Sequence, residues 1–76
     1  MGEDAKKGNS MAVAKIIELT SRSGTSLDDA VAKGIAKAGE SVHNMQTAWV
    51  KDQQVILADD KVSEYQVTLK ITFLVE

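Results

Sequence analysis

The side chains that could do chemistry in this sequence are few and scattered. The serines lack the Gly-x-Ser-x-Gly pattern of a nucleophile elbow, and the run GIAKAG lacks the Gly-Lys-Ser/Thr ending of a phosphate-binding loop. The carboxylates are dispersed, and no spacing brings two of them together as the acid and the base of a hydrolase. No residue is a candidate for catalysis, and we expect a protein that is not an enzyme.

Metal ligands are equally sparse. The sequence has no cysteine and a single histidine, His43, so a zinc site is not expected. His43 follows the apolar stripe of an expected helix near its C-terminal end, where a cation is favoured by the helix dipole, and capping is a better interpretation than catalysis. Asp28 and Asp29 could meet their copies in an oligomer and hold calcium. Solvated acids at a helix start are far commoner, and we predict no metal site.

Trp49 is the only tryptophan, and it stands among polar residues in MQTAWVKDQQ, residues 45–54. Leaving an indole in bulk water would forgo about 1.5–3 kcal/mol of burial, so a ligand, another copy of the chain or both should cover it. Packing in a subunit interface is our first interpretation, because aromatic side chains are enriched there without any ligand. Stacking against a ligand is the alternative.

Length and charge limit the classes of protein. The 76 residues suit one domain, and so short a chain buries only about 60% of its unfolded surface, so it needs disulfides, a metal or partner subunits. Oligomerisation is the supplement that remains. The net charge of −2 and the scattered basic residues argue against nucleic acid. Apolar runs fall short of the roughly 20 residues of a membrane span and no signal peptide is recognisable, so we expect a cytoplasmic protein without a membrane partner.

The elements of the fold follow from the apolar periodicity. Residues 1–10 are polar and are expected to form a flexible tail outside a domain of residues 11–76. Residues 11–20 favour a first strand, which the run SRSG should end. Ser26 then starts a helix, because its hydroxyl can cap the helix N-terminus and acidic residues follow it. Gly34, beside the apolar stripe that continues to residue 42, indicates that another element approaches the helix closely.

The rest of the chain predicts a long β-hairpin. Residues 46–57 and 61–76 alternate apolar and polar side chains, and the acidic pair at 59 and 60 suits a tight turn. In the resulting register Leu57 lies opposite Val62, and an apolar face with Val50 beside Leu69 and Ala48 beside Ile71 receives the helix. The opposite face carries Thr47, Trp49, Lys51 and Gln53, in register with Thr72, Lys70, Thr68 and Gln66.

These elements predict an α+β fold with the order β-α-β-β. A three-stranded antiparallel sheet should half-wrap one helix on its apolar side. A right-handed crossover from the first strand to the second leaves room for the last strand between them. Such a two-layer unit has a second face and sheet edges that invite assembly.

This order of elements resembles the dodecin family. KIIELT before the helix, WVKDQ in the second strand and EYQVTLKITFLVE at the end follow the dodecin pattern without gaps from about Val13 to Glu76. The resemblance implies a hollow homododecamer with cubic symmetry. In flavin-binding dodecins, two flavins stack near a two-fold axis between tryptophans of neighbouring subunits, and a glutamine of the last strand hydrogen-bonds the flavin ring.

The resemblance also indicates site residues. Gln66 has the position of that glutamine, but Thr47 has the position of the stacking tryptophan. Stacking contributes about 1–3 kcal/mol per ring, which Thr47 cannot supply. Trp49 lies about 6.6–6.8 Å farther along the same face, where it either stacks on a shifted ligand or fills the pocket. Gln66 equally suits a cross-strand amide pair with Gln53, or a hydrogen bond between subunits.

Two main hypotheses of function follow. The first is a non-catalytic homododecamer that binds or stores a flavin such as FMN or riboflavin, with Trp49, Gln66, Thr47 and Gln53 at the site. The second is a dodecin-like shell that binds no flavin, with Trp49 packed in a subunit interface and ions or another cofactor in its channels. A weaker alternative is an adaptor that binds a partner protein at an exposed sheet edge.

Overall fold

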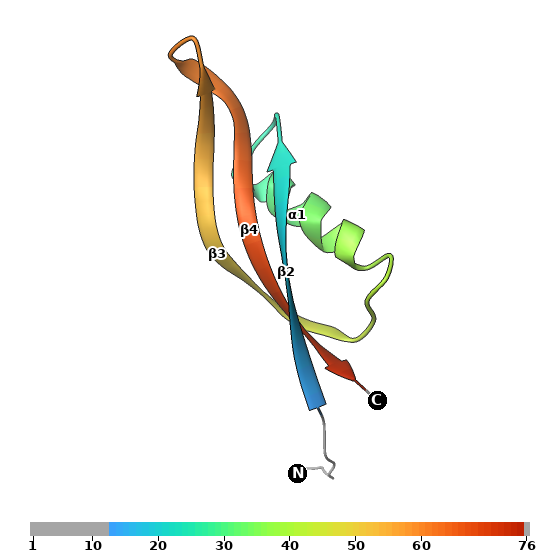
Figure 1. The fold of residues 1–76 in the computed structure, drawn as a ribbon. Coiled ribbons are helices and arrows are strands. Elements are labelled where there is room, and N and C mark those ends of the chain that lie inside the picture. Colours follow the sequence, from blue (N-terminus) through green and yellow to red (C-terminus); the bar gives the residue numbers. More distant parts are fainter. Residues whose placement is uncertain (1–12, 76) are drawn as a thin grey trace.

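The structure, a computed structural model, describes residues 13–75, so the expected tail at residues 1–10 lies outside the described residues. The elements are the strand β2 (Val13–Ser23), the helix α1 (Leu27–Ala38), and the strands β3 (Met45–Ala58) and β4 (Lys61–Val75). The sheet is antiparallel, with β4 between β2 and β3 (Figure 1), which confirms the predicted order and the central place of the last strand. Within this range no helix is long and apolar enough to cross a membrane.

The strand β2 is longer than the sequence predicts. The run SRSG was expected to end it after residue 20, but Ser21, Arg22 and Ser23 continue the pairing with β4. The long central strand offers backbone partners to these residues, and this pairing outweighs their weak intrinsic preference for a strand.

The start of α1 is fixed to the end of β2 by side-chain hydrogen bonds. As predicted, Ser26 caps the helix, and its hydroxyl accepts a bond of 2.9 Å from the backbone N–H of Asp29. The buried Ser23 hydroxyl donates to the Asp29 carboxylate at 2.6 Å and accepts from the backbone N–H of Thr25. Lys33 lies 2.9 Å from the same carboxylate. The bond between Ser23 and Asp29 therefore ties the end of the strand directly to the first turn of the helix.

The end of α1 differs from the prediction. The helix stops at Ala38, and Gly39 caps it by donating its backbone N–H to the carbonyl of Ile35. The predicted continuation of the helical stripe to Val42 is wrong. His43 is exposed and lies beyond the last helical residue. It does not cap the helix as predicted, and Gly39 does.

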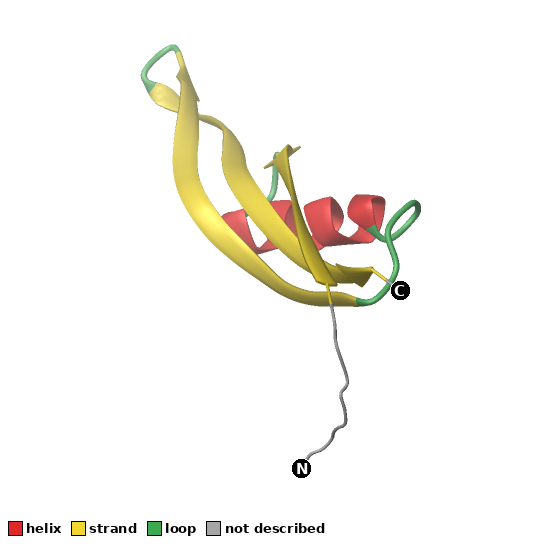
Figure 2. Ribbon diagram, turned by 60° about the horizontal axis from the view of Figure 1, so that its bottom comes forward, coloured by secondary structure: helices red, strands yellow, loops and turns green. Residues whose placement is uncertain are grey.

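The core lies between α1 and the middle of β4. Its buried apolar side chains are those of Ala30, Ala38, Val67, Leu69 and Ile71. A Cβ built on the buried Gly34 would lie 2.8 Å from Cδ1 of Leu69 and 3.1 Å from Cβ of Ser21. The missing side chain thus lets the helix lie close to the sheet, as the sequence predicted. Figure 2 shows α1 against one face of the curved sheet.

The hairpin turn has the expected residues. Asp59 and Asp60 have φ angles of 53° and 63°, which is the backbone of a two-residue type I′ turn. The turn tolerates aspartate because its short side chain visits the left-handed region more readily than most.

The helix covers only part of the apolar sheet face. Its 12 residues span about 18 Å, whereas the 15 residues of β4 span about 50 Å, and the hairpin extends well past α1 (Figure 1). We call Val55, Leu57 and Val62 the hairpin overhang; their side chains are 45%, 62% and 53% exposed. Nothing else in the described chain covers them.

We predict that Gly34→Ala destabilises the fold. The buried Leu69 and the backbone-anchored Cβ of Ser21 have no room to retreat. Overpacking of a core lowers the free energy of unfolding by about 1–3 kcal/mol. The better helix propensity of alanine offsets about 1 kcal/mol of this loss. Urea unfolding should show a net loss of up to about 2 kcal/mol. The exposed position Ala32→Gly calibrates propensity alone, and a Gly34→Ala variant more stable than the wild type would contradict the close packing.

We predict a pH-dependent contribution from Asp29. The Ser23 hydroxyl, followed by Lys33, lowers the pKa of this carboxyl below its ordinary value of 3.8. A lowered folded-state pKa contributes stability that is present above the unfolded value and is lost as the pH falls through the folded one. Asp29→Asn should therefore be less stable than the wild type at pH 7, with the difference shrinking below pH 3.8. Asp28→Asn, which removes the same charge from the same turn, should show a smaller effect at pH 7. Equal losses in both variants would refute the specific role of Asp29.

Candidate functional site

The register of β3 against β4 decides which side chains share the sheet face away from α1. Near the turn and near Trp49 the predicted pairs are present, with Val50 opposite Leu69 and Ala48 opposite Ile71. Between these regions the register shifts by one residue, at Ile56/Leu57 and again at Val50/Asp52. Each β-bulge adds one residue to one strand, so the residues that follow it point to the opposite face of the sheet from the one that simple alternation predicts. After the second bulge the residues of β3 again lie on their predicted faces.

The bulges correct the predicted position of Gln53. It lies opposite Val67, on the helix-facing side of the sheet, and Gln54 takes the place opposite Gln66. Simple alternation from the turn misplaces every residue between the two bulges. Gln53 therefore does not share a face with Trp49 and Gln66, and the predicted Gln53–Gln66 amide pair is wrong.

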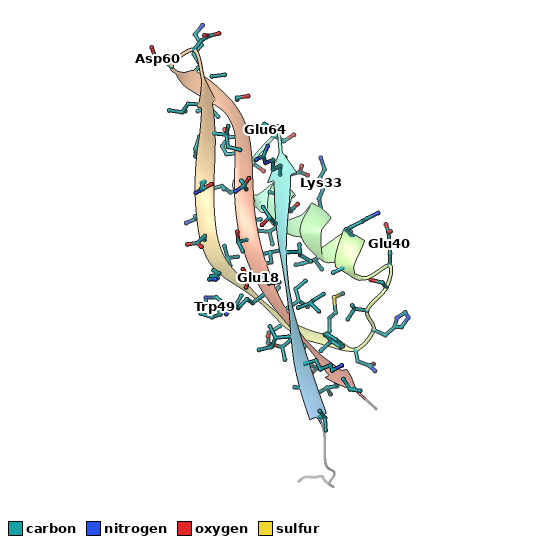
Figure 3. The ribbon with its side chains drawn as sticks, in the orientation of Figure 1. Glu18, Lys33, Glu40, Trp49, Asp60 and Glu64 are labelled. Carbon is teal, nitrogen blue, oxygen red and sulfur yellow. The ribbon has the colours of Figure 1, made fainter. Side chains whose placement is uncertain are left out.

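Trp49 occupies the sheet face away from α1, as the sequence predicted. It lies opposite Lys70, whose neighbours in β4, Leu69 and Ile71, point into the core. The indole is 62% exposed and projects from β3 away from the helix (Figure 3). The Lys70 Nζ lies 5.5 Å from the centroid of its ring, within the range of a cation–π contact.

Thr47 lies on the same face, opposite Thr72, and is exposed. It is two residues from Trp49 on the same strand, and its side chain is small and carries a hydroxyl. The structure thus brings together two of the predicted site residues, and Trp49 is the only one of these two that offers a flat aromatic surface.

An ion pair crosses the sheet next to the indole. The Lys51 Nζ of β3 lies 3.5 Å from the Glu18 carboxylate of β2, although Glu18 is the register partner of Lys70. Both side chains are partly exposed, so this pair contributes about 0–1 kcal/mol to stability. The pair matters more for the charge around Trp49, because the positive charge of Lys51 offsets the negative charge of Glu18.

Gln66 lies in a separate polar chain on the same face. Its side-chain oxygen accepts a bond of 2.7 Å from Nε of Arg22, and its Nε2 donates to the side-chain oxygen of Gln54 at 3.0 Å. Arg22 also contacts the carboxylate of Glu64 at 3.5 Å. Gln66 thus forms a cross-strand amide pair with Gln54 and not with Gln53, which was predicted as its partner. A primary amide has two donors and two acceptor positions, so within residues 13–75 Gln66 keeps one of each for a further contact.

The two groups do not meet within one chain. Lys70, opposite Trp49, is four residues along β4 from Gln66, a distance of about 13 Å by strand rise. Across residues 13–75 the single chain encloses no pocket, and no three histidine, aspartate or glutamate side chains of this range cluster as metal ligands. Residues 13–75 of one chain therefore carry the Trp49 group and the Gln66 group at two separate places on one sheet face.

Sequence reasoning missed Gln54, Arg22 and the contact of Lys70 with the indole. The alternation of β4 placed Lys70 on the correct face, but the sequence held no signal that its ammonium would turn toward the ring. Gln54 was missed because the bulge at Lys51 has no local sequence mark. Arg22 was missed because the strand β2 was ended too early.

Comparisons with known proteins agree on one family. The family model described as Dodecin matches residues 13–76. The dodecin from Streptomyces davaonensis is 25% identical over 88% of this chain and 98% of that chain, with a TM-score of 0.83. A mutant of the Thermus thermophilus dodecin is 29% identical over 87% of this chain and 98% of that chain, with a TM-score of 0.82.

A third similar structure is a calcium-chelating antigen, calcium dodecin, from Mycobacterium tuberculosis, described with a novel calcium-binding site. It is 26% identical over 84% of this chain and 91% of that chain, with a TM-score of 0.75. No curated protein matches the sequence.

Proposed function

Because this chain belongs to the dodecin family, we propose that it is a non-catalytic protein that binds and stores a flavin-type ligand in a homododecamer. The family match and the shared fold support small-ligand binding by an oligomer in general. The observation that carries the proposal for this chain is Trp49, a 62% exposed indole on the sheet face away from the helix. An indole left in water forgoes the free energy of its burial, so a ligand or another copy of the chain is expected to cover it.

Assembly is supported by the hairpin overhang. Its three apolar side chains lie past the end of α1 and are 45–62% exposed. An apolar patch of this kind on a small chain with a small core is typical of a subunit interface. A neighbouring copy of the chain is the occupant that the family predicts.

The site itself needs two copies of the chain. A flavin ring stacked on Trp49 of one copy does not reach Gln66 of that copy, about 13 Å away along the sheet. Gln66 of a neighbouring copy is the residue we assign to the ring edge, because it keeps one free donor and one free acceptor. The ligand is shifted from Thr47 toward Trp49 relative to the family pattern. Stacked aromatic rings would quench the excited state of the flavin, which suits protection or buffering.

The alternative function is a dodecin-like shell that binds no flavin. Two observations favour it: Thr47 stands at the stacking position of the family, and the Lys70 ammonium already lies over the Trp49 ring. In that case the indole packs between subunits, and the cargo is an ion or another cofactor. The calcium-chelating relative is a precedent for such a cargo. The cytoplasmic location expected from the sequence stays a prediction under both functions.

We predict that the overhang is required for assembly. Light scattering of the wild-type protein at micromolar concentration should give the mass of twelve chains. Leu57→Asp should give smaller species, because each copy loses about 1.5–3 kcal/mol of apolar burial and places a charge in the interface. Ser63→Asp adds the same charge to an exposed polar residue near the turn and serves as the control. A wild-type protein that remains a monomer or dimer would contradict the closed assembly.

We predict that the wild-type protein quenches riboflavin emission with saturation near one flavin per subunit. Trp49→Ala removes the stacking surface and should weaken binding by about 1–3 kcal/mol, or roughly 5- to 150-fold. Trp49→Phe keeps a smaller ring and should be intermediate, and light scattering of both variants checks that they assemble. Persistent free-flavin emission at high wild-type concentration would exclude flavin and leave the shell function.

A further inference from the structure

We propose that Lys70 is the specificity-determining residue of the Trp49 site and that it selects planar ligands carrying an anionic group over neutral planar ligands. The proposal rests on the proposed ring-binding function of Trp49 and adds the class of ligand that the site prefers. It assigns a role to a residue that neither the sequence pattern nor the shared fold singles out.

The first observation is the position of the ammonium group. Lys70 is the register partner of Trp49, and its Nζ lies 5.5 Å from the centroid of the indole ring. Side chains of directly opposed residues have Cβ atoms about 4.5–5.5 Å apart, so the long lysine chain can fold onto the ring without leaving its strand position. The half-buried Lys70 therefore occupies the surface that a stacking ligand would use.

The second observation is that Lys70 forms no ion pair within residues 13–75. The nearest acidic residue by register is Glu18, directly across from Lys70, but its carboxylate is paired with Lys51 at 3.5 Å. Asp52 faces Thr68, one pleat along the sheet, and does not form an ion pair with Lys70. Within residues 13–75, Lys70 has no carboxylate within 4.0 Å, and its charge is balanced only by the electron-rich face of the indole.

These observations predict that neutral and anionic ligands bind to the Trp49 ring with different affinities. A neutral ring that stacks on the covered face of Trp49 must displace the ammonium, which loses its only partner in the described chain. An anionic group on the ligand offers that ammonium a stronger partner at the moment of displacement. The long, flexible lysine chain can swing from the ring to such a group while its backbone stays in the strand. The site should therefore favour the anionic member of any pair of ligands that share one ring.

Riboflavin and FMN are such a pair, because they share the isoalloxazine ring and differ by a phosphate. We expect wild-type protein at low salt to bind FMN about tenfold more tightly than riboflavin, measured by flavin quenching. Lys70→Met keeps the length of the side chain without its charge, and should bring the ratio to within about twofold, because FMN loses its ionic partner and riboflavin no longer has to displace an ammonium. Lys70→Arg should retain the preference. Added salt should reduce the preference in the wild type.

Lys61→Met is the matched control. It removes the same charge from an exposed lysine at the hairpin turn, at the far end of β4 from the Trp49 row, and should keep the wild-type ratio. Light scattering and circular dichroism establish that each variant assembles and folds as the wild type does. A preference that survives in Lys70→Met, or a wild type that does not distinguish FMN from riboflavin, would overturn the proposal.

A second probe pair separates this proposal from the flavin function. Naphthalene-2-sulfonate and 2-naphthol are planar rings with and without a fixed negative charge, and calorimetry can measure both. If neither flavin binds but the sulfonate binds more tightly than the naphthol, in a way that Lys70→Met abolishes, the flavin function fails and the role of Lys70 stands. If flavins bind without preference, the flavin function stands and the role of Lys70 fails. If no charged probe is preferred in either pair, the role of Lys70 is refuted.

Discussion

The difference in length between one short helix and two long strands governs this structure. The 12 residues of α1 can protect only about 18 Å of an apolar sheet face that continues along β4 for about 50 Å. Gly34 lets the helix pack directly against the side chains of Leu69 and Ser21, so the core is tight but small. The rest of the apolar face, the hairpin overhang, stays 45–62% exposed. The association that we propose would follow from how little of its own surface this chain can bury.

The same constraint explains why the candidate site is open within residues 13–75 of one chain. The sheet face away from α1 has no layer of its own to cover it, and it carries the 62% exposed indole of Trp49 and the amide of Gln66. These groups are about 13 Å apart along the sheet. A ligand that contacts both groups needs a second copy of the chain, as we propose. In that proposal, binding and assembly are parts of one physical problem.

Much of the fold could be predicted because local and long-range signals agree. The alternation in β4, the aspartates of the turn and the cap at Ser26 each act over a few residues and gave the correct element order, faces and turn. The failures lie where tertiary pairing decides. Arg22 joins a strand because β4 offers it a partner, and Gln53 changes face because β-bulges shift the register of β3 against β4. Lys70 contacts the indole, whereas its register partner Glu18 forms an ion pair with Lys51. The sequence does not reveal which lysine pairs with Glu18.

The most direct measurement of the central claim is a crystal structure of the assembled protein after incubation with riboflavin. It should show neighbouring copies covering the hairpin overhang, and a flavin ring held between Trp49 of one copy and Gln66 of another. An assembly in which Leu57 and Trp49 remain open to solvent in every copy would contradict the account. So would a ring bound entirely within one chain.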